Sequence, residues 1–344
     1  DNMLFRSNVI SFLRQKMTEM GFLEIQTPIL CASSPEGARD YIVPSRKFKG
    51  KFYALPQAPQ QYKQLLMVSG FDKYFQIAPC FRDEDARADR SPGEFYQLDM
   101  EMAFASQEDV FAIMEDVLPP IFAKYGIHHK ASEAPFMRIP YLEAMEKYGS
   151  DKPDLRIDLL VQDATAVLAD CGFEPFAGKT VKALVAENFT GTRKQIDKMC
   201  ADVEVVSAQK TYWFRLDENG ELVGGISKFV QEKKAAVIEA LGLKNGSFVA
   251  LAAGDLKTAQ KTAGVIRKTL ASSIDGYMKK EEYAFCWIVD FPMYEIGEES
   301  GELEFCHNPF SMPQGGMEAL ETKEPLDILA YQYDLVCNGV ELSS

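Results

Sequence analysis

The sequence predicts an α+β protein built from about two domains. The chain has 344 residues, and one domain typically takes roughly 100–200 residues. Segments with the apolar period of a helix alternate with short runs of β character. Between residues 157 and 280 the pattern changes to short helices and strands that follow each other closely. We therefore expect a main α+β domain interrupted by an inserted α+β domain.

Composition and charge exclude several classes of protein. Hydrophobic residues make up 47% of the chain and charged residues 26%, which is ordinary globular usage, and no apolar run approaches the ~18 residues needed to cross a bilayer. A disordered or membrane-spanning protein is therefore not expected. The 37 Lys and Arg against 51 Asp and Glu give a net charge of −14, so a nucleic acid would bind only at a local patch.

The cysteines and the chain ends add two further expectations. The seven cysteines are odd in number, widely spaced and never form a C-x-x-C pair, which fits neither a disulfide framework nor a zinc site. We expect a reducing, cytoplasmic compartment. The chain starts at Asp1 without a signal-peptide pattern and stops just after the apolar residues 334–342, so we expect it to be a fragment.

The first elements are an amphipathic helix and an edge strand. Apolar residues recur at mostly helical spacing up to Gly21, which supplies the stop; they are Leu4, Val9, Phe12, Leu13, Met17 and Met20. Residues 22–30 then alternate weakly, and Pro28 restricts this run to the edge of a sheet. Such an edge could pair with a second subunit, so we expect a homodimer.

Two further helices are expected in the first half of the chain. One starts near Pro59 and runs to Gly70, with Gln60 and Lys63 on one face at i, i+3. The other starts at Ser106 with the pattern of a capping box. The pair at residues 119 and 120, both proline, should kink or end that helix.

A hairpin of high charge is expected between residues 74 and 104. Residues 83–93 form a charged loop between two β-like runs. In the second run Gln97, Asp99 and Glu101 share one polar face, and the hairpin could bring Arg82 of the first run near it. The alternative is a surface hairpin with a solvated polar face, but the apolar context of both runs disfavours it.

Such a polar face, if it lines a cleft, suits a nucleotide. An arginine can clamp a phosphate, carboxylates can hold an ammonium group or Mg²⁺, and Phe95 can stack on a planar base. There is no Walker A sequence and no G-x-G-x-x-G, which disfavours P-loop and Rossmann sites. His307 could hydrogen-bond a substrate or be structural. Asp334 and Glu341, seven apart, would share a face if helical and lie on opposite faces if extended.

The second half of the chain predicts compact α+β structure. Strands at 211–216 and 222–230 flank a turn at 217–220, and a strand at 247–253 precedes a helix capped by Asp255. Residues 283–294 have the character of a buried strand. The acidic residues 295–304 are expected to form a hairpin loop.

Several of these stretches together resemble the class II aminoacyl-tRNA synthetases, in the form found in the bacterial aspartate-specific branch. Residues 81–90 (FRDEDARADR) and 94–101 (EFYQLDME) are similar to motif 2 of that family. Residues 21–28 are similar to motif 1, 34–41 to a loop that covers the amino acid, 57–67 to a substrate-contacting helix, and 149–156 (GSDKPDLR) to the start of the bacterial insertion domain. The resemblance spans essentially the whole chain.

The resemblance implies a role for each matching residue. Arg82 would be catalytic and contact the α-phosphate of ATP, Glu84 would lie at the ATP site, and Phe95 would stack on adenine. The residues matching the aspartate pocket are Glu36, Gln60, Lys63, Asp99 and His307. Asp334 and Glu341 would match the acidic pair that holds Mg²⁺ with ATP, Glu341 also contacting ATP.

The implied function is activation of L-aspartate by ATP and transfer of the aspartyl group to the 3′ end of tRNA. The expected cofactors are ATP and Mg²⁺, and the expected partners are L-aspartate, ATP, tRNA for aspartate with tRNA for asparagine left open, and a second copy of the chain; a membrane is not expected. A lysine in the pocket should reject asparagine, which would leave that charge unpaired. The alternatives are an asparagine-specific synthetase and an inactive synthetase-like binding protein.

The resemblance also implies a domain division and some departures from the family. Residues 1–156 and 281–344 would form the catalytic domain, an antiparallel sheet flanked by helices, and residues 157–280 the insertion. The anticodon-reading β-barrel and motif 3, with its arginine, would be absent from this stretch of sequence. Residues 91–93 (SPG) and Asn308 differ from residues of some relatives.

Overall fold

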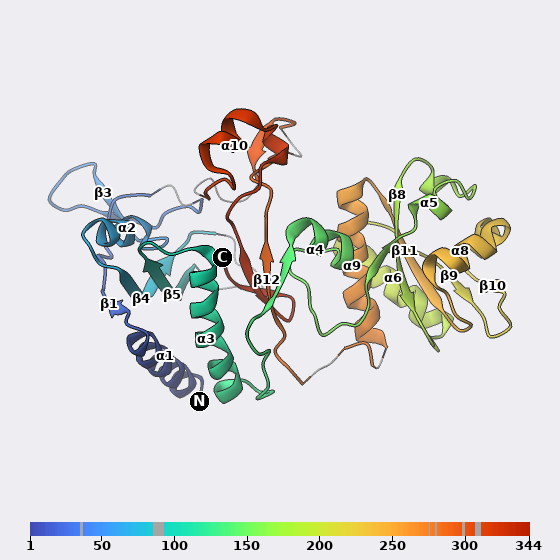
Figure 1. The fold of residues 1–344 in the computed structure, drawn as a ribbon, viewed down its shortest axis with the longest axis horizontal. Helices are drawn as coiled ribbons and strands as arrows, with labels where there is room; N and C mark the ends of the chain where they lie inside the picture. The colour runs from blue at the N-terminus through green and yellow to red at the C-terminus, as the bar shows by residue number, and fades with distance from the viewer. Residues whose placement is uncertain (35–36, 85–92, 275, 279–280, 298–299, 307–310) are drawn as a thin grey trace. The chain divides into compact units, whose positions relative to one another are not determined.

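The computed structural model of the protein describes residues 1–34, 37–84, 93–274, 276–278, 281–297, 300–306 and 311–344. The chain forms two compact units, Asp1–His129 and Lys130–Ser344, whose helices and strands are labelled in Figure 1. Most strand pairs in both units are antiparallel, and helices pack on the sheets, which confirms the α+β class. Among the described residues, none of the helices combines the length and apolar character that crossing a bilayer requires.

The first unit is a small sheet with helices packed on it. Its elements are α1 (Asn2–Glu19), β1 (Leu23–Glu24), β2 (Ile42–Pro44), β3 (Phe52–Ala54), α2 (Gln60–Val68), β4 (Lys73–Phe81), β5 (Glu94–Met102) and α3 (Gln107–Tyr125). Strands β4 and β5 form the expected antiparallel hairpin, with Gln76 opposite Asp99 and Cys80 opposite Phe95. Strand β1 pairs in parallel with β4 at the edge of this sheet, so the edge position is as expected, but the strand covers only Leu23–Glu24 of the expected residues 22–30.

The apolar face of the β4–β5 hairpin is covered by α1 and α3. Met17 and Phe22 are buried there, together with Val117 and Ile121 of α3. Val9, Phe12 and Leu13 pack against the same cluster, whereas Leu4 is exposed. Burial of this stripe along α1 is the reason that the helix forms where the spacing predicts it.

Of the two expected effects of the proline pair, a kink or an end, helix α3 contradicts the end. It begins at a capping box, in which Ser106 accepts from the Asp109 backbone and Asp109 accepts from the Ser106 backbone. It does not end at residues 119 and 120 but continues to Tyr125. Ile121, Phe122 and Tyr125 pack with the apolar cluster of this unit, and this burial compensates for the backbone hydrogen bonds that proline cannot donate.

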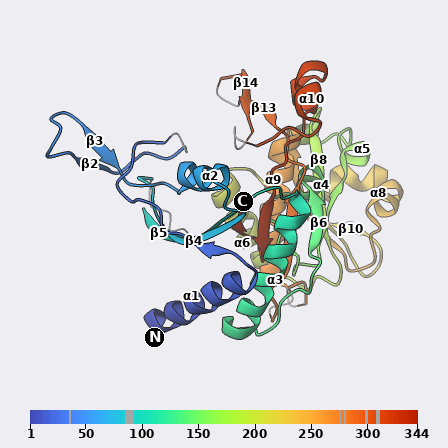
Figure 2. The same ribbon diagram turned by 60° about the vertical axis from the view of Figure 1, so that its left-hand side comes forward.

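The second unit contains two sheets and several helices. Its elements are β6 (Met137–Pro140), α4 (Tyr141–Tyr148), β7 (Val161–Asp163), α5 (Thr165–Leu168), η1 (Glu174–Phe176), β8 (Thr180–Ala186), α6 (Arg193–Ser207), β9 (Tyr212–Leu216), β10 (Leu222–Val223), α7 (Ser227–Val230), η2 (Gln231–Lys233), α8 (Lys234–Leu241), β11 (Phe248–Gly254), α9 (Leu256–Ser273), β12 (Phe285–Val289), β13 (Tyr294–Ile296), β14 (Leu303–Phe305), α10 (Gly316–Thr322), η3 (Pro325–Asp327), β15 (Asp334–Cys337) and β16 (Val340–Ser343). Figure 2 gives a second view of these elements.

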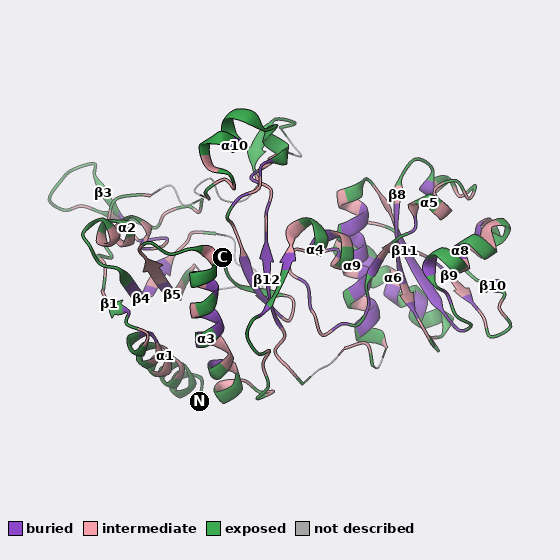
Figure 3. Ribbon diagram, viewed as in Figure 1, coloured by how far each residue is buried: buried purple, intermediate pink, exposed green. Residues whose placement is uncertain are grey.

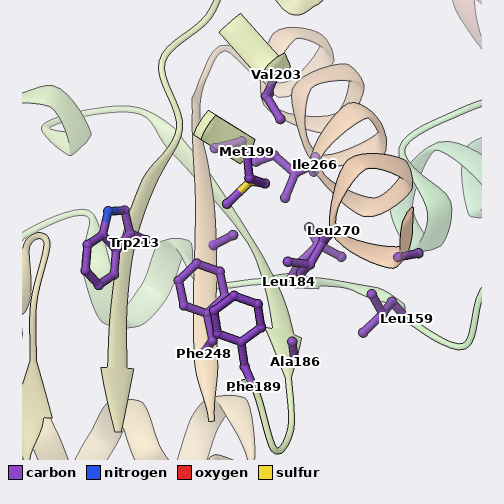
Figure 4. Packing of buried hydrophobic residues seen from close by; sticks show 14 of the residues in the cluster. Leu159, Leu184, Ala186, Phe189, Met199, Val203, Trp213, Phe248, Ile266 and Leu270 are labelled. Carbon is purple, nitrogen blue, oxygen red and sulfur yellow. The ribbon is translucent and has the colours of Figure 1, made fainter. Parts of the chain in front are cut away.

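A five-stranded sheet in the order β10-β9-β11-β8-β7 lies between two helical layers. Along β11, Phe248, Ala250 and Ala252 join the cluster that includes α6 and α9, while Val249 and Leu251 join the opposite cluster with α5 and α8. Figure 3 shows β8 and β11 as buried strands, and Figure 4 shows Ile266 and Leu270 of α9 beside Leu184 of β8. A strand buried on both faces has a continuous apolar sequence.

Two details of this sheet differ from the sequence expectation. The turn at residues 217–220 does connect β9 to β10, but β10 ends at Val223, and residues 227–230 are helical rather than extended. Gly224 and Gly225 follow the strand with positive φ, and residue 225 must be glycine because a Cβ there would collide with the Trp213 carbonyl. The predicted cap of the long helix is confirmed, since Asp255 accepts from the Thr258 backbone at the start of α9.

The second sheet has the order β16-β15-β12-β6. Strand β12 is buried throughout, and it pairs with β15 antiparallel and with β6 parallel. Strands β15 and β16 form a hairpin whose turn is Asn338 and Gly339, both with positive φ. Beyond β12 a hairpin forms as expected, but Glu295 and Glu304 lie in its paired strands β13 and β14 rather than in its loop.

Close contacts connect α4 with the five-stranded sheet. Gly149, at the end of α4, lies so near Gly264 of α9 that a Cβ on either would overlap the backbone of the other. Lys182 of β8 is almost fully buried and pairs with Glu146 of α4 at 2.6 Å and with Asp163 of β7 at 2.8 Å. The three-part domain division stays a prediction, because the boundary between the units falls at His129 and residues 157–280 lie with 281–344 in the second unit.

Candidate active site

A charged cluster links α2 to β5 in the first unit. Lys63 Nζ lies 3.1 Å from Asp99 Oδ1 and 3.3 Å from Glu101 Oε2. The Lys63 and Asp99 side chains are 13% and 9% exposed, so the ion pair lies in a region where charges interact more strongly than at the surface. Burial opposes the charged form of Lys63, but the two carboxylates outweigh it and raise the pKa of the ammonium group.

Two oxygen atoms beside this cluster have no hydrogen-bond partner within the described part of the chain. They are Oδ2 of Asp99 and the hydroxyl oxygen of Tyr74, and both are buried. Burial first, and then the nearby Asp99 charge, raise the pKa of the Tyr74 hydroxyl. Buried polar atoms normally have partners. The Tyr74 hydroxyl is a nearby donor for Asp99, and the second Asp99 oxygen keeps the capacity to accept a hydrogen bond from a cationic group such as an ammonium.

Arg82 and Phe95 form the second feature of this unit. The Arg82 guanidinium carbon lies 5.0 Å from the centre of the Phe95 ring, and Arg82 Nε donates to the Gln57 carbonyl at 3.4 Å. The hairpin register causes this contact, because Cys80 lies opposite Phe95 and the Arg82 backbone donates to Gly93 at 2.8 Å. A guanidinium and an aromatic ring side by side can bind a phosphate and a planar base.

Gln57 is a buried residue at the start of the stretch 57–67, to which the sequence assigned no individual role. Its side chain accepts from the Ala38 backbone at 3.1 Å and donates to the Ala38 carbonyl at 2.8 Å and to Asp40 Oδ1 at 2.7 Å. It is 2% exposed. Gln57 therefore connects the segment around Ala38 to the start of α2 and, through its own carbonyl, to Arg82.

The other residues expected at the site make fewer contacts or lie outside the described residues. Gln60 lies in the first turn of α2 and is half-buried. Glu84 is exposed, and its backbone donates to the Arg82 carbonyl at 3.0 Å. Glu36 and His307 lie outside the described residues.

Asp334 and Glu341 come together in the second unit, on β15 and β16. Of the two alternatives, neither the helix nor a single extended run occurs: the turn at Asn338 and Gly339 folds the segment into a hairpin, with Val336 opposite Glu341. Asp334 is buried and its Oδ1 has no partner among the described residues. Burial, followed by the charge of Glu341, raises the pKa of the Asp334 carboxyl to about 7.

Lys152 and Asp151 accompany this acidic pair. Lys152 Nζ lies 3.1 Å from Glu341 Oε2 and 2.9 Å from Asp151 Oδ2. The described residues include no group of three or more His, Cys, Asp or Glu arranged to hold a metal ion. Mg²⁺, however, commonly uses one or two carboxylates together with substrate phosphates. The unpartnered Asp334 oxygen and the carboxylates of this pair therefore fit Mg²⁺ bound with a nucleotide.

Sequence reasoning predicted some of these groupings and missed others. The structure joins Lys63 to Asp99 and Arg82 to Phe95 in the first unit, and Asp334 to Glu341 in the second. It does not join Arg82 to the carboxylates of β5 by any ion pair within the described residues. The sequence missed the Asn338-Gly339 hairpin signal. Glu101 was on the expected polar face, but no local signal identified Lys152 as a partner of Glu341.

Comparison with known proteins gives consistent matches over the full chain. The family model described as tRNA synthetases class II (D, K and N) matches residues 1–344. A curated relative from Streptomyces avermitilis, named aspartate–tRNA ligase, is 55% identical over 345 residues, covering 100% of this chain and 58% of the relative. Relatives named aspartate–tRNA(Asp/Asn) ligase are 53% identical in Rickettsia bellii, over 59% of that relative, and 55% identical in Zymomonas mobilis, over 58%.

The chain thus spans just under three fifths of the length of these curated relatives. The matched regions cover the whole of this chain and therefore both units. From the family match over all 344 residues and these relatives, we conclude that the chain belongs to the class II tRNA synthetases of the D, K and N group.

Proposed function

We propose that this chain activates L-aspartate with ATP and transfers the aspartyl group to tRNA. The observation that carries the proposal is the largely buried cluster of Lys63, Asp99 and Glu101, in a class II synthetase that is more than half identical to aspartate–tRNA ligases. Lys63 supplies a positive charge for the side-chain carboxylate of aspartate. Asp99, with its unpartnered Oδ2, supplies a negative charge for the α-ammonium group. These two charges match those of the amino acid.

The proposed roles at the nucleotide follow the chemistry of the side chains. Arg82 would hold the α-phosphate and act there as the catalytic residue, and Phe95 would stack on adenine with Glu84 nearby. Asp334 and Glu341 would hold Mg²⁺, which supplies positive charge to the phosphates when bound. Gln60, Glu36 and His307 are proposed to complete the aspartate pocket. The residues contribute position and charge, since no side-chain nucleophile is needed for either step.

In the first proposed step, a carboxylate oxygen of aspartate attacks the α-phosphorus of ATP and pyrophosphate leaves. In the second, a hydroxyl of the terminal adenosine of tRNA attacks the activated carbonyl and AMP leaves. We propose tRNA for aspartate as the acceptor. The names of the Rickettsia and Zymomonas relatives make tRNA for asparagine a second acceptor to be tested.

Exchange of pyrophosphate into ATP tests the first step. We expect exchange that depends on aspartate and Mg²⁺, and at least a hundredfold lower kcat/KM for aspartate in Lys63→Met, because the substrate carboxylate loses its counter-charge. The exposed Lys49 provides the matched control, and Lys49→Met should leave exchange unchanged. Exchange that responds to asparagine instead of aspartate would support an asparagine-specific synthetase, and none with either amino acid would support an inactive binding protein.

We also propose a homodimer formed through the edge strand β1 and the exposed apolar residues near the start of α1, among them Met3 and Leu4. A monomeric mass in sedimentation would contradict it.

Two wider proposals concern the domain division and the compartment. We propose that residues 157–280 form the insertion domain. The seven cysteines without disulfides support a reducing, cytoplasmic compartment.

A further inference from the structure

The acidic pair of the second unit already contacts a positive charge. Lys152 Nζ lies 3.1 Å from Glu341 Oε2 and 2.9 Å from Asp151 Oδ2. The Lys152 side chain is 23% exposed, so it is held in the protein more than an ordinary surface lysine. Asp334, on the neighbouring strand, keeps one buried oxygen without a partner among the described residues.

The loop that carries Lys152 is fixed by several hydrogen bonds. The Lys152 backbone donates to Ser150 Oγ at 3.0 Å. Two residues further on, Asp154 is buried and accepts from Arg156 Nε at 2.9 Å and Nη2 at 2.8 Å. The buried Arg267 of α9 donates to the Asp154 carbonyl at 3.0 Å. Lys152 is therefore presented by an ordered loop.

The hairpin that carries Glu341 packs on the same loop. A Cβ at Gly339, in the β15–β16 turn, would lie 3.4 Å from Asp154 Cβ and 3.6 Å from the Lys152 carbonyl. The loop that carries Lys152 and the hairpin that carries Glu341 are therefore in contact, although the two residues are far apart in the sequence.

A lysine in this position affects a bare metal ion and a metal–nucleotide complex differently. The Lys152 ammonium group forms an ion pair with the Glu341 carboxylate, and it repels a divalent cation that approaches without a nucleotide. ATP phosphates bring negative charge with the metal, so the repulsion is offset when both bind together. The ammonium can then remain on Asp151.

We propose that Lys152 is a positioning residue that holds Glu341 and makes the Asp334–Glu341 pair take up Mg²⁺ together with the nucleotide rather than alone. This inference rests on the proposed function for its choice of ligand. It assigns to the loop at residues 149–156 a role in metal uptake, and it explains why a lysine lies within contact distance of a pair of residues suited to a cation.

Titration with Mn²⁺ alone, followed by electron paramagnetic resonance on the full-length protein, tests this inference. We expect Lys152→Met to bind Mn²⁺ at least fivefold more tightly than the wild type, because the competing ammonium is gone. Lys152→Arg keeps the charge and should behave like the wild type. The matched control is Lys147→Met, which removes an exposed lysine paired with Glu143 at 2.7 Å on α4 and should change nothing.

The added affinity must come from Glu341. The double variant Lys152→Met with Glu341→Gln should therefore lose the gain and return to the wild-type affinity or below it. Lys152→Gln repeats the comparison with a polar chain if Met at this position prevents folding. Mn²⁺ binding in folded Lys152→Met and Lys152→Gln that is no tighter than in the wild type would overturn the inference.

A separate titration distinguishes this inference from the proposed function. The wild type is titrated with Mn²⁺ in the presence of a non-hydrolysable ATP analogue, which should strengthen Mn²⁺ binding at least tenfold. The same addition should strengthen it less in Lys152→Met, since that variant already binds the bare ion. No nucleotide effect in the wild type would contradict the proposed function, whereas the Mn²⁺ affinities without nucleotide decide the role of Lys152.

Discussion

At the residue scale, a few buried polar atoms in each unit have no hydrogen-bond partner among the described residues. Lys63 satisfies one oxygen of Asp99 and leaves the other, and Asp334 keeps one oxygen without a partner in the described part of the chain. An unpaired buried polar atom costs roughly 1–3 kcal/mol. A chain tolerates such a cost most readily where a ligand supplies the missing partner.

The carboxyl group of Asp334 leads to a pH-dependent prediction. Its pKa in the folded protein is raised to about 7, mainly by burial, so the folded state binds a proton more strongly than the unfolded state. The ionised form is therefore disfavoured in the folded protein above pH 7, and the penalty vanishes below about pH 4, where both states are protonated. Asp334→Asn removes this penalty.

We expect Asp334→Asn to raise the free energy of unfolding by roughly 2–4 kcal/mol at pH 8 in EDTA and by close to zero at pH 4. Urea unfolding at several pH values measures the difference. Asp202→Asn changes an exposed carboxylate in an i, i+4 pair and should alter stability by less than ~0.5 kcal/mol at either pH. A constant effect of Asp334→Asn across this pH range would show that burial does not disfavour its charge.

Gln57 gives the second prediction at this scale. Its three side-chain hydrogen bonds hold the segment around Ala38, and its carbonyl contacts Arg82. Gln57→Ala should lower the free energy of unfolding by about 1–3 kcal/mol and speed hydrogen exchange at the Ala38 amide. Gln61→Ala, at the neighbouring exposed glutamine of α2, should do neither. An unchanged exchange rate at the Ala38 amide in Gln57→Ala would show that Gln57 does not hold this segment.

At the scale of elements, helix starts and turns follow local sequence closely. The capping box at Ser106, the cap at Asp255 and the turn at residues 217–220 all occur where the residues predict them. Each depends on hydrogen bonds between residues at most a few positions apart, so the sequence alone contains the information. The length of α3 beyond its prolines depends on burial of Ile121, which no local rule supplies.

The capping box at the start of α3 can be tested directly. Ser106→Ala removes the side-chain oxygen that accepts from the Asp109 backbone and should lower the free energy of unfolding by about 1 kcal/mol. Ser272→Ala is the matched control, because Ser272 lies inside α9 and its hydroxyl bonds the Lys268 carbonyl; alanine there should be neutral or slightly stabilising. Equal losses in thermal denaturation would argue against the cap.

At the scale of the whole molecule, the second unit depends on a buried arginine. Arg267 of α9 donates to the carbonyls of Asp154, Ile157 and Leu159 and lies 5.0 Å from the centre of the Tyr148 ring. Burial lowers the pKa of its guanidinium to about 10, which still leaves it charged at neutral pH. One side chain thus joins α9 to the end of α4 and to the segment that leads into the five-stranded sheet.

Removing this arginine should affect much of the second unit. Arg267→Met leaves three buried carbonyls without their donor and should lower the free energy of unfolding by at least about 3 kcal/mol. Lys198→Met, at an exposed lysine of α6 paired with Asp202, should cost less than ~0.5 kcal/mol. Denaturant unfolding of the two variants makes the comparison, and similar stabilities would mean that Arg267 does not support the fold.

The sequence by itself determined the family resemblance, the α+β class, the β4–β5 hairpin with its polar face, and the caps of α3 and α9, because each is encoded in residues near one another in the chain. Only the tertiary structure decided which distant groups meet. The order β16-β15-β12-β6 and the loop held by Arg267 bring Lys152 to Glu341. Burial also determines which carboxylate oxygens lack a hydrogen-bond partner. Such contacts arise from the packing of whole sheets, so no local pattern of residues can specify them.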